Sequence, residues 1–164
     1  TLLKSPDIIF ANAAELTHTS GIADVEEAIK HAFPESKLMV ITNGAKGSLV
    51  RLNDKVLTIP PESVSREDVK DTTGAGDIYM GVMLAALFSR PTDQWTEDFV
   101  TSCAGIGTYA SSLVIQSFDS RLTTDQLHDI RDRIMAMNAR YQVEETIHGD
   151  RTGVDDHNGH TQFL

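Results

Sequence analysis

Two short apolar runs near the start of the chain predict buried strands. They span residues 7–12 and 37–43, and each ends at an asparagine. A continuous apolar run of this length is typical of a strand covered on both faces of its sheet. Between the runs, Asp24 stands where a helix N-cap is expected, and the apolar positions after it predict a helix through His31.

Two weaker strand patterns and three helix patterns follow. Residues 48–53 and 55–60 alternate less regularly, which predicts a hairpin near a sheet edge. The helices are expected at about 78–88, from 96 or 97 to 116, and from 123 or 124 onward, where Thr and Gln fit a capping box. The order of elements predicts a layered α/β fold. A few strands with three long trailing helices resemble the second half of a larger sheet.

The end of the chain is predicted to differ from the rest. From residue 142 onward the sequence is polar and acidic, so we expect residues 142–164 to form a loose tail after a packed part of residues 1–141. On the last packed helix, Arg131 and Arg133 alternate with acidic residues, and we expect both side chains to be solvated.

Composition narrows the class of partner and the compartment. The chain has 164 residues and a formal net charge of −10, which argues against a nucleic-acid binder and against an anionic membrane surface. Its longest uncharged apolar run, residues 78–88, is too short to span a bilayer. The single cysteine, Cys103, excludes an intramolecular disulfide and favours a reducing, cytoplasmic compartment. No neighbouring Lys or Arg would stabilise its thiolate, which predicts a packing role.

The glycine-rich segment from Asp71 to Asp77 carries the clearest chemical signal. It reads D-T-T-G-A-G-D and precedes an apolar helix. Glycine lets backbone N–H groups approach an anion closely, and the positive end of the helix dipole points at the same place. A carboxylate at the helix start is placed to accept a proton from a hydroxyl, so the segment suits phosphoryl transfer. A glycine-rich N-cap with Asp77 as a capping residue explains the segment equally well.

Two strand ends carry polar residues that would complete such a site. Asn12 and Glu15 follow the first strand, and Thr42, Gly44 and Gly47 follow the second. Ligands of open α/β sheets bind at the carboxyl ends of strands, so these residues are candidates for metal and nucleotide contacts. Taken alone, the first pair is better explained as a helix-capping pair, and the second group as an ordinary hairpin turn. The sequence contains neither a Walker A loop nor a G-x-G-x-x-G fingerprint.

The order N-x-x-E, T-x-G-x-x-G and D-T-T-G-A-G-D, at these separations, resembles the C-terminal half of the ribokinase-like, or PfkB, carbohydrate and nucleoside kinases. The resemblance covers about residues 5–135. It implies a three-layer, Rossmann-like α/β sheet with flanking helices, of which this chain carries the C-terminal portion only. Residues 1–141 would then be the ATP-binding and catalytic part. The N-terminal half of the family, with most acceptor-binding residues, has no counterpart in the sequence.

The resemblance implies an ATP-dependent kinase that transfers the γ-phosphoryl group to a hydroxymethyl of a nucleoside or sugar. Asp77 resembles the catalytic base that takes the acceptor proton. Gly74, Ala75 and Gly76, with the amide of Asp77, resemble the anion hole that stabilises the transferring group.

The resemblance also implies cofactors. Asn12 and Glu15 resemble the pair that orders Mg²⁺ and its waters near the phosphates, with Glu15 acting through water. Asp71 resembles a ligand of a monovalent cation such as K⁺. The turn that contacts the nucleotide would consist of Thr42, Gly44 and Gly47.

Residues 103–112 read C-A-G-I-G-T-Y-A-S-S and resemble the adenosine-kinase branch of that family, which favours an adenosine-like acceptor. Close packing of two helices explains the small residues as well, and related sugar kinases share much of this helix. The alternatives are a sugar kinase of the same family, or a truncated half domain that binds nucleotide without catalysis. Half a sheet exposes an edge and an apolar face, which predicts association into a homo-oligomer.

Overall fold

The computed structural model describes residues 6–149, with side chains through residue 143, and shows a four-stranded sheet between helices. Its strands are β1 (Ile8–Asn12), β2 (Leu38–Thr42), β3 (Ser48–Leu52) and β4 (Lys55–Ile59), in the order β1-β2-β3-β4. The β1–β2 pair is parallel and the other two pairs are antiparallel. All four expected strands are therefore confirmed, with the hairpin at one edge.

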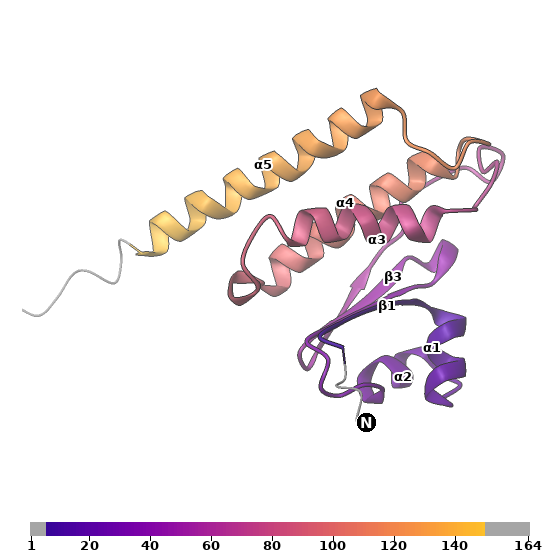
Figure 1. Ribbon diagram of the computed structural model, residues 1–164, viewed down its shortest axis with the longest axis horizontal. Coiled ribbons are helices and arrows are strands. Elements are labelled where there is room, and N and C mark those ends of the chain that lie inside the picture. The colour runs from indigo at the N-terminus through magenta and orange to yellow at the C-terminus, as the bar shows by residue number, and fades with distance from the viewer. Residues whose placement is uncertain (1–5, 150–164) are drawn as a thin grey trace, which may run out of the picture.

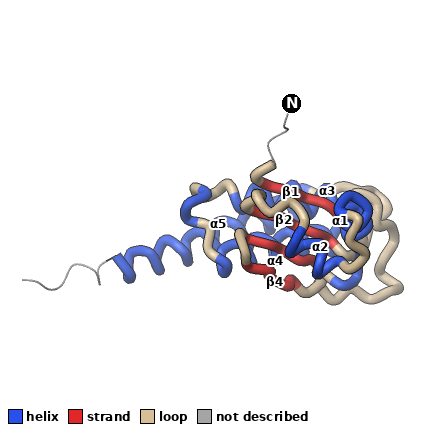
Figure 2. Tube along the Cα trace, turned by 90° about the horizontal axis from the view of Figure 1, so that it is seen from below, coloured by secondary structure: helices blue, strands red, loops and turns tan. Residues whose placement is uncertain are grey.

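Five helices complete the layers. They are α1 (Ala13–Ser20), α2 (Val25–His31), α3 (Ala75–Leu87), α4 (Glu97–Val114) and α5 (Thr124–Gly149). Helices α1 and α2 cover one face of the sheet, α3 and α4 cover the other, and α5 lies outside α4 (Figure 1). The view from below shows α1 and α2 in front of the strands and the end of α5 extending past the sheet (Figure 2). The expected three-layer α/β architecture is confirmed.

Side-chain caps begin four of the five helices, α1, α2, α4 and α5, and the sequence indicates those at Asp24 and Thr123. Asp24 accepts a hydrogen bond from the Glu27 N–H at 2.9 Å at the start of α2. Before α5, the Thr123 N–H donates to the Gln126 side chain at 2.9 Å, and the Gln126 N–H donates back to the Thr123 hydroxyl at 3.3 Å. These bonds satisfy N–H groups that have no partner inside the helix. Thr96 caps α4 in the same way.

Four expectations need correction. Helix α1 was not expected, and α3 begins at Ala75 rather than near residue 78, because Gly74 already turns the chain into the helix. The tail boundary at 141 falls inside α5, which continues to Gly149, since no Gly or Pro interrupts the helix before that residue. Residues 150–164 of the expected tail lie outside the described residues. Strand β1 is only half-buried, because it is an edge strand of the described sheet.

The two faces of β2 supply the centre of two separate cores. Leu38 and Val40 face the core beneath α3 and α4, whereas Met39 and Ile41 face the core beneath α1 and α2. All four side chains are fully buried. This is why β2 reads as a continuous apolar run: successive side chains point to opposite faces, and both faces are covered.

Helix α5 packs on α4 through aromatic and cationic contacts. The Arg133 guanidinium lies 3.8 Å from the centroid of the Tyr109 ring, and its Nε donates to Asp129 at 2.9 Å. The Asp129 hydrogen bond raises the pKa of Tyr109. Arg133 is exposed, as expected, and in addition contacts Tyr109 of α4, which the sequence did not indicate. Arg131 pairs with its exposed neighbour Asp132 and is solvated, as expected.

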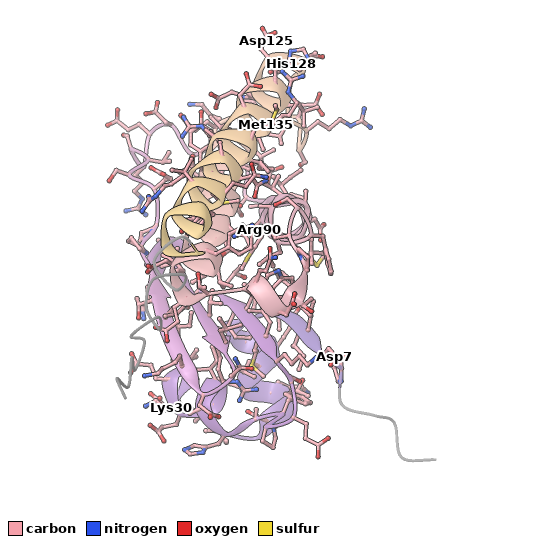
Figure 3. The ribbon with its side chains drawn as sticks, turned by 90° about the vertical axis from the view of Figure 1, so that its left-hand side faces the viewer. Asp7, Lys30, Arg90, Asp125, His128 and Met135 are labelled. Carbon is pink, nitrogen blue, oxygen red and sulfur yellow. The ribbon has the colours of Figure 1, made fainter. Side chains whose placement is uncertain are left out.

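A view from the side places the helices relative to the sheet (Figure 3). Asp125 and His128 lie at the far end of α5, while Lys30 of α2 lies at the opposite end of the molecule, beyond the sheet.

Within residues 6–149, no helix is both long and apolar enough to cross a membrane.

A buried arginine joins β3 to the end of α2. Arg51 is 3% exposed, and its guanidinium donates to the carbonyls of Ile29 and Ala32 at 3.0 Å and of Phe33 at 2.6 Å. These carbonyls lie at the negative end of the helix dipole, where a cation is favourable. Burial lowers the pKa of Arg51, and Asp54 opposes that shift. The arginine thus fixes α2 against the sheet.

Replacing Arg51 by Met should lower the free energy of unfolding by about 3 kcal/mol, because several buried carbonyls lose their donor. The measurement is urea denaturation followed by circular dichroism. Arg131→Met is the matched control: its exposed ion pair should contribute no more than about 0.5 kcal/mol. Equal effects of the two substitutions would contradict the role assigned to Arg51.

Two buried groups should make the fold sensitive to alkaline pH. Burial raises the pKa of Tyr79 from 10.0 to about 12, and that of the Cys103 thiol from 9.0 to about 12. The unfolded chain therefore loses these protons at lower pH than the folded chain does. The contribution of these two protonated groups to the free energy of unfolding is complete below pH 9 and is lost as the pH rises towards 12.

We expect the free energy of unfolding to fall above pH 9, by about 1.4 kcal/mol per pH unit for each group ionised only in the unfolded chain. Urea titrations across that range measure the slope. Cys103→Ala should reduce the slope, and Tyr79→Phe should reduce it at the upper end of the range. An unchanged slope in both variants would contradict the assignment.

Candidate functional site

The glycine-rich segment makes a tight turn into α3. Gly74 is the N-cap, with a φ of 78° that favours glycine. The Ala75 N–H donates back to the Thr72 carbonyl at 3.3 Å. The N–H groups of Gly76 and Asp77 have no hydrogen-bond partner among residues 6–149. These two amides lie at the positive end of the α3 dipole, an arrangement suited to binding an anion.

Asp77 is the third residue of α3, and its side chain is exposed. No side chain caps this helix, because the N-cap is Gly74. The interpretation of Asp77 as a capping residue is therefore wrong. Its carboxylate is instead available to the space at the start of the helix.

That space is a small cleft of about 250 Å³ between the sheet and α3. Asn12 lines it from the end of β1, Glu15 from the first turn of α1, Thr42 from the end of β2, and Gly76 and Asp77 from the start of α3. Figure 1 shows why these residues meet: the carboxyl end of β1 and the beginning of α3 lie on the same side of the molecule. The parallel pairing of β1 and β2 brings their ends together as well.

Asn12 and Glu15 form a reciprocal capping box at the start of α1. The Glu15 N–H donates to Asn12 Oδ1 at 2.9 Å, and the Asn12 N–H donates to Glu15 Oε2 at 2.8 Å. The capping explanation of this pair is thus confirmed. Capping does not exclude a role of the pair in the cleft, because both residues also line the cleft. The capping bonds hold the carboxylate and the amide in place at its wall.

A larger cleft of about 530 Å³ adjoins the first. Thr42 and Gly76 line both clefts, so the two meet at the start of α3. The turn after β2 forms one wall of the larger cleft through Gly44 and Gly47. The other walls come from the connection between β4 and α3 and from the last turns of α4, including Ile115. A long cleft that ends at unpaired helix amides has the form expected of a nucleotide site.

The end of α4 anchors the glycine-rich segment. The N–H groups of Lys70 and Asp71 both donate to the Ile115 carbonyl, at 2.8 and 3.3 Å. On the other side, a Cβ added to Gly74 would lie 3.3 Å from the Cβ of Ser120. The segment is therefore held between α4 and the loop that follows α4.

Asp71 lies at the beginning of this segment and lines neither cleft. Its carboxylate accepts the Thr73 N–H at 2.9 Å. That hydrogen bond lowers the pKa of Asp71. The carboxylate is therefore charged at neutral pH and braces the turn, and a cation-binding role for Asp71 stays a prediction.

The structure brings most of the predicted site residues together. They reach one or both clefts, with two exceptions, Gly74 and Asp71, which shape the turn beside them. Sequence reasoning missed the contribution of the β4–α3 connection to the larger cleft. It also missed the hydroxyl groups of Thr108, Ser111 and Ser112 in the wall of the larger cleft. The sequence held one indication of these hydroxyl groups, the run of small residues in α4. Close packing of two helices explains that run as well.

Comparison with known proteins decides the family. A model of the pfkB family carbohydrate kinases matches residues 1–127. The chain belongs to this family. The glycine-rich turn, the N-x-x-E pair and the turn after β2 are thus features of a pfkB-family chain, and they lie around one pair of clefts.

Several members of the pfkB family resemble the chain over part of their length. Adenosine kinase of Schizosaccharomyces pombe is 33% identical over 93 residues, which are 49% of this chain and 27% of that protein. Cytidine kinase of Thermococcus kodakarensis is 37% identical over 91 residues, which are 54% of this chain and 32% of that protein. The solved adenosine kinase of Sinorhizobium meliloti superposes with a TM-score of 0.65 at 25% identity, over 77% of this chain and 36% of that chain. The chain thus spans about a third of the length of these relatives.

Gly47 tests the wall of the larger cleft. Its φ is 86°, and an added Cβ would lie 2.1 Å from the Ile59 carbonyl oxygen, so the turn after β2 or the end of β4 would have to shift. We expect Gly47→Ala to cost about 2 kcal/mol or more in the free energy of unfolding.

Gly81→Ala is the control, because an added Cβ there meets nothing within 4 Å. Within α3 it should stabilise by about 0.5–1 kcal/mol. Thermal denaturation of both variants measures the difference, and a neutral Gly47→Ala would contradict the described turn.

Proposed function

We propose that the chain supplies the ATP-binding and catalytic-base part of a pfkB-family kinase, which transfers the γ-phosphoryl group of ATP to a hydroxymethyl group of a nucleoside or sugar. One observation carries this proposal: two clefts meet at the unpaired amides at the start of α3, and a carboxylate, Asp77, lines the smaller cleft. The family membership supports it.

In this proposal the larger cleft holds the nucleoside part of ATP. Its walls combine apolar side chains such as Val64 and Ile115 with the glycine turn after β2. The phosphates would extend towards Gly76, where the larger cleft opens into the smaller one. The amides of Gly76 and Asp77 would then stabilise the charge on the transferring phosphoryl group.

The smaller cleft has the donor set that Mg²⁺ prefers. Asn12, Glu15 and Thr42 line it, and their side chains carry oxygen atoms, the hard ligands that suit this ion. Residues 6–149 contain no group of three or more His, Cys, Asp or Glu that could hold a metal ion. Mg²⁺ would therefore be held by few protein oxygens together with water and the phosphates, as is usual for this ion. When bound, it neutralises charge on the phosphates.

Asp77 would act on the acceptor. Its carboxylate takes the proton from the acceptor hydroxyl as that oxygen forms a bond to the γ-phosphorus. The bond between the γ-phosphorus and the bridging oxygen breaks, and ADP leaves. Asp77 is in the first turn of α3, so the proposed base and the unpaired amides belong to the same rigid helix.

The relatives include an adenosine kinase, a cytidine kinase and a fructokinase. We propose an adenosine-like nucleoside for this chain, since adenosine kinases are found among both the sequence and the structure matches. We further expect K⁺, with Asp71 as a ligand, to assist the phosphoryl transfer. We also expect the protein to be located in the cytoplasm.

A second candidate is a half domain that binds nucleotide and associates without catalysis. The observations that favour it are the free edge of β1 within the described sheet and the coverage of about a third of the relatives. Light scattering at several concentrations tests the association. If the chain is strictly monomeric and releases no ADP, association is excluded and only the nucleotide-binding part of this candidate remains. Acceptor-dependent ADP release would exclude the candidate altogether.

The experiment that tests the leading proposal is a coupled assay for ADP release with MgATP and K⁺. Adenosine, guanosine, inosine, ribose and fructose are supplied separately. Turnover that depends on adenosine supports the proposal, and turnover that depends on fructose or ribose assigns a sugar acceptor instead. If the chain alone is inactive, the assay is repeated with a chain extended by the remaining part of the family fold, and failure there would overturn the proposal.

In the active form, Asp77→Asn should lower turnover by about 10²–10⁴-fold, because the base is lost. MgATP affinity should stay within about twofold, since the amide keeps the shape of the carboxylate. Asp98→Asn is the matched control, because Asp98 is also an exposed acid in the first turn of a helix but lies outside both clefts. Undiminished turnover of Asp77→Asn would remove Asp77 from the role of base.

A further inference from the structure

Ser111 makes a hydrogen bond between α4 and the first turn of α3. Its Oγ donates to the Ala75 carbonyl oxygen at 2.9 Å. Ser111 lies near the end of α4, is half-buried, and lines the larger cleft. It is thus a side-chain link between α4 and the residue that precedes Gly76.

The acceptor of this bond belongs to the peptide that carries the Gly76 amide. The Ala75 carbonyl and the Gly76 N–H are parts of one planar unit, so fixing the direction of the carbonyl also fixes the direction of the N–H. A hydrogen bond to the carbonyl oxygen also polarises the peptide and strengthens its N–H as a donor. The Gly76 N–H is unpaired among the described residues, and Gly76 lines both clefts.

Two other hydroxyl groups in the same wall behave differently. Thr108 donates to the Ala104 carbonyl at 3.0 Å, and Ser112 donates to the Tyr109 carbonyl at 2.7 Å, so both bonds stay within α4. A hydroxyl has one proton to donate. Because Ser111 gives its proton to Ala75, it offers a bound nucleotide only its lone pairs.

We propose that Ser111 is a positioning residue, which aims the Gly76 amide at the phosphate group of a bound nucleotide. The proposal rests on the proposed function, since it needs the start of α3 to bind phosphate. It adds a residue of α4 to the apparatus of the anion hole. The Ile115 carbonyl anchors the beginning of the same segment, so the end of α4 holds it at two places.

The test compares two ligands by titration calorimetry of the purified chain. MgADP reaches the start of α3 with its phosphates, whereas adenosine does not. Ser111→Ala should weaken MgADP binding about fivefold, the value of one ordinary hydrogen bond. It should leave adenosine affinity within about twofold. Ser111→Thr keeps the hydroxyl and should restore MgADP affinity.

Ser102→Ala is the matched control. Ser102 is also on α4, and its hydroxyl makes an interhelical hydrogen bond with Tyr141 at 3.1 Å, but it lines neither cleft. This variant should bind both ligands as the unmodified chain does. Equal losses for MgADP and adenosine in Ser111→Ala, or no recovery in Ser111→Thr, would overturn the proposal in favour of a simple wall contact.

A second readout separates this proposal from the proposed function. The Ile78 N–H donates to the Gly74 carbonyl at 2.9 Å and so reports opening of the first turn of α3. Hydrogen exchange at Ile78, measured without ligand, should be several-fold faster in Ser111→Ala and unchanged in Ser102→Ala. If the unmodified chain binds neither ligand, the proposed function fails. If exchange at Ile78 is unchanged, Ser111 does not hold the turn.

Discussion

The close packing of α3 on α4 is the constraint on which the rest of the site depends. A Cβ added to Gly107 in α4 would lie 3.1 Å from the Tyr79 carbonyl oxygen and 3.4 Å from the Met83 Cβ, so a side chain there would push the two helices apart by a few tenths of an ångström. The approach brings the last turns of α4 within hydrogen-bonding distance of the glycine-rich turn. The start of α3 is thereby fixed beside the carboxyl ends of β1 and β2.

From that fixed point, the two clefts follow from the topology. Parallel β1 and β2 end on the same side, and the polar residues after each strand face the helix start. The dipole of α3 and its unpaired amides then determine where a negative charge is favourable. Arg51 acts at the other end of the sheet, where it secures α2, and so contributes to stability rather than to the site.

Sequence reasoning predicted the parts of this account that depend on local pattern. The continuous apolar run of β2 predicted burial on both faces, and the D-T-T-G-A-G-D segment predicted the helix start that carries Asp77. It could not find the link from Ser111 to Ala75, because that bond joins residues far apart in the chain and depends on the distance between two helices. The same reason hid the contact of Arg133 with Tyr109. Periodicity identifies the faces of a helix but not the neighbour on each face.

The most direct test of the account is an NMR titration of the ¹⁵N-labelled chain with MgADP. The amides of Gly76 and Asp77 should shift strongly, together with those of Thr42 and Gly47, because the first pair binds phosphate and the others line the nucleoside cleft. Shifts confined to residues outside the two clefts, or no shifts at saturating MgADP, would contradict the assignment of the nucleotide to the start of α3.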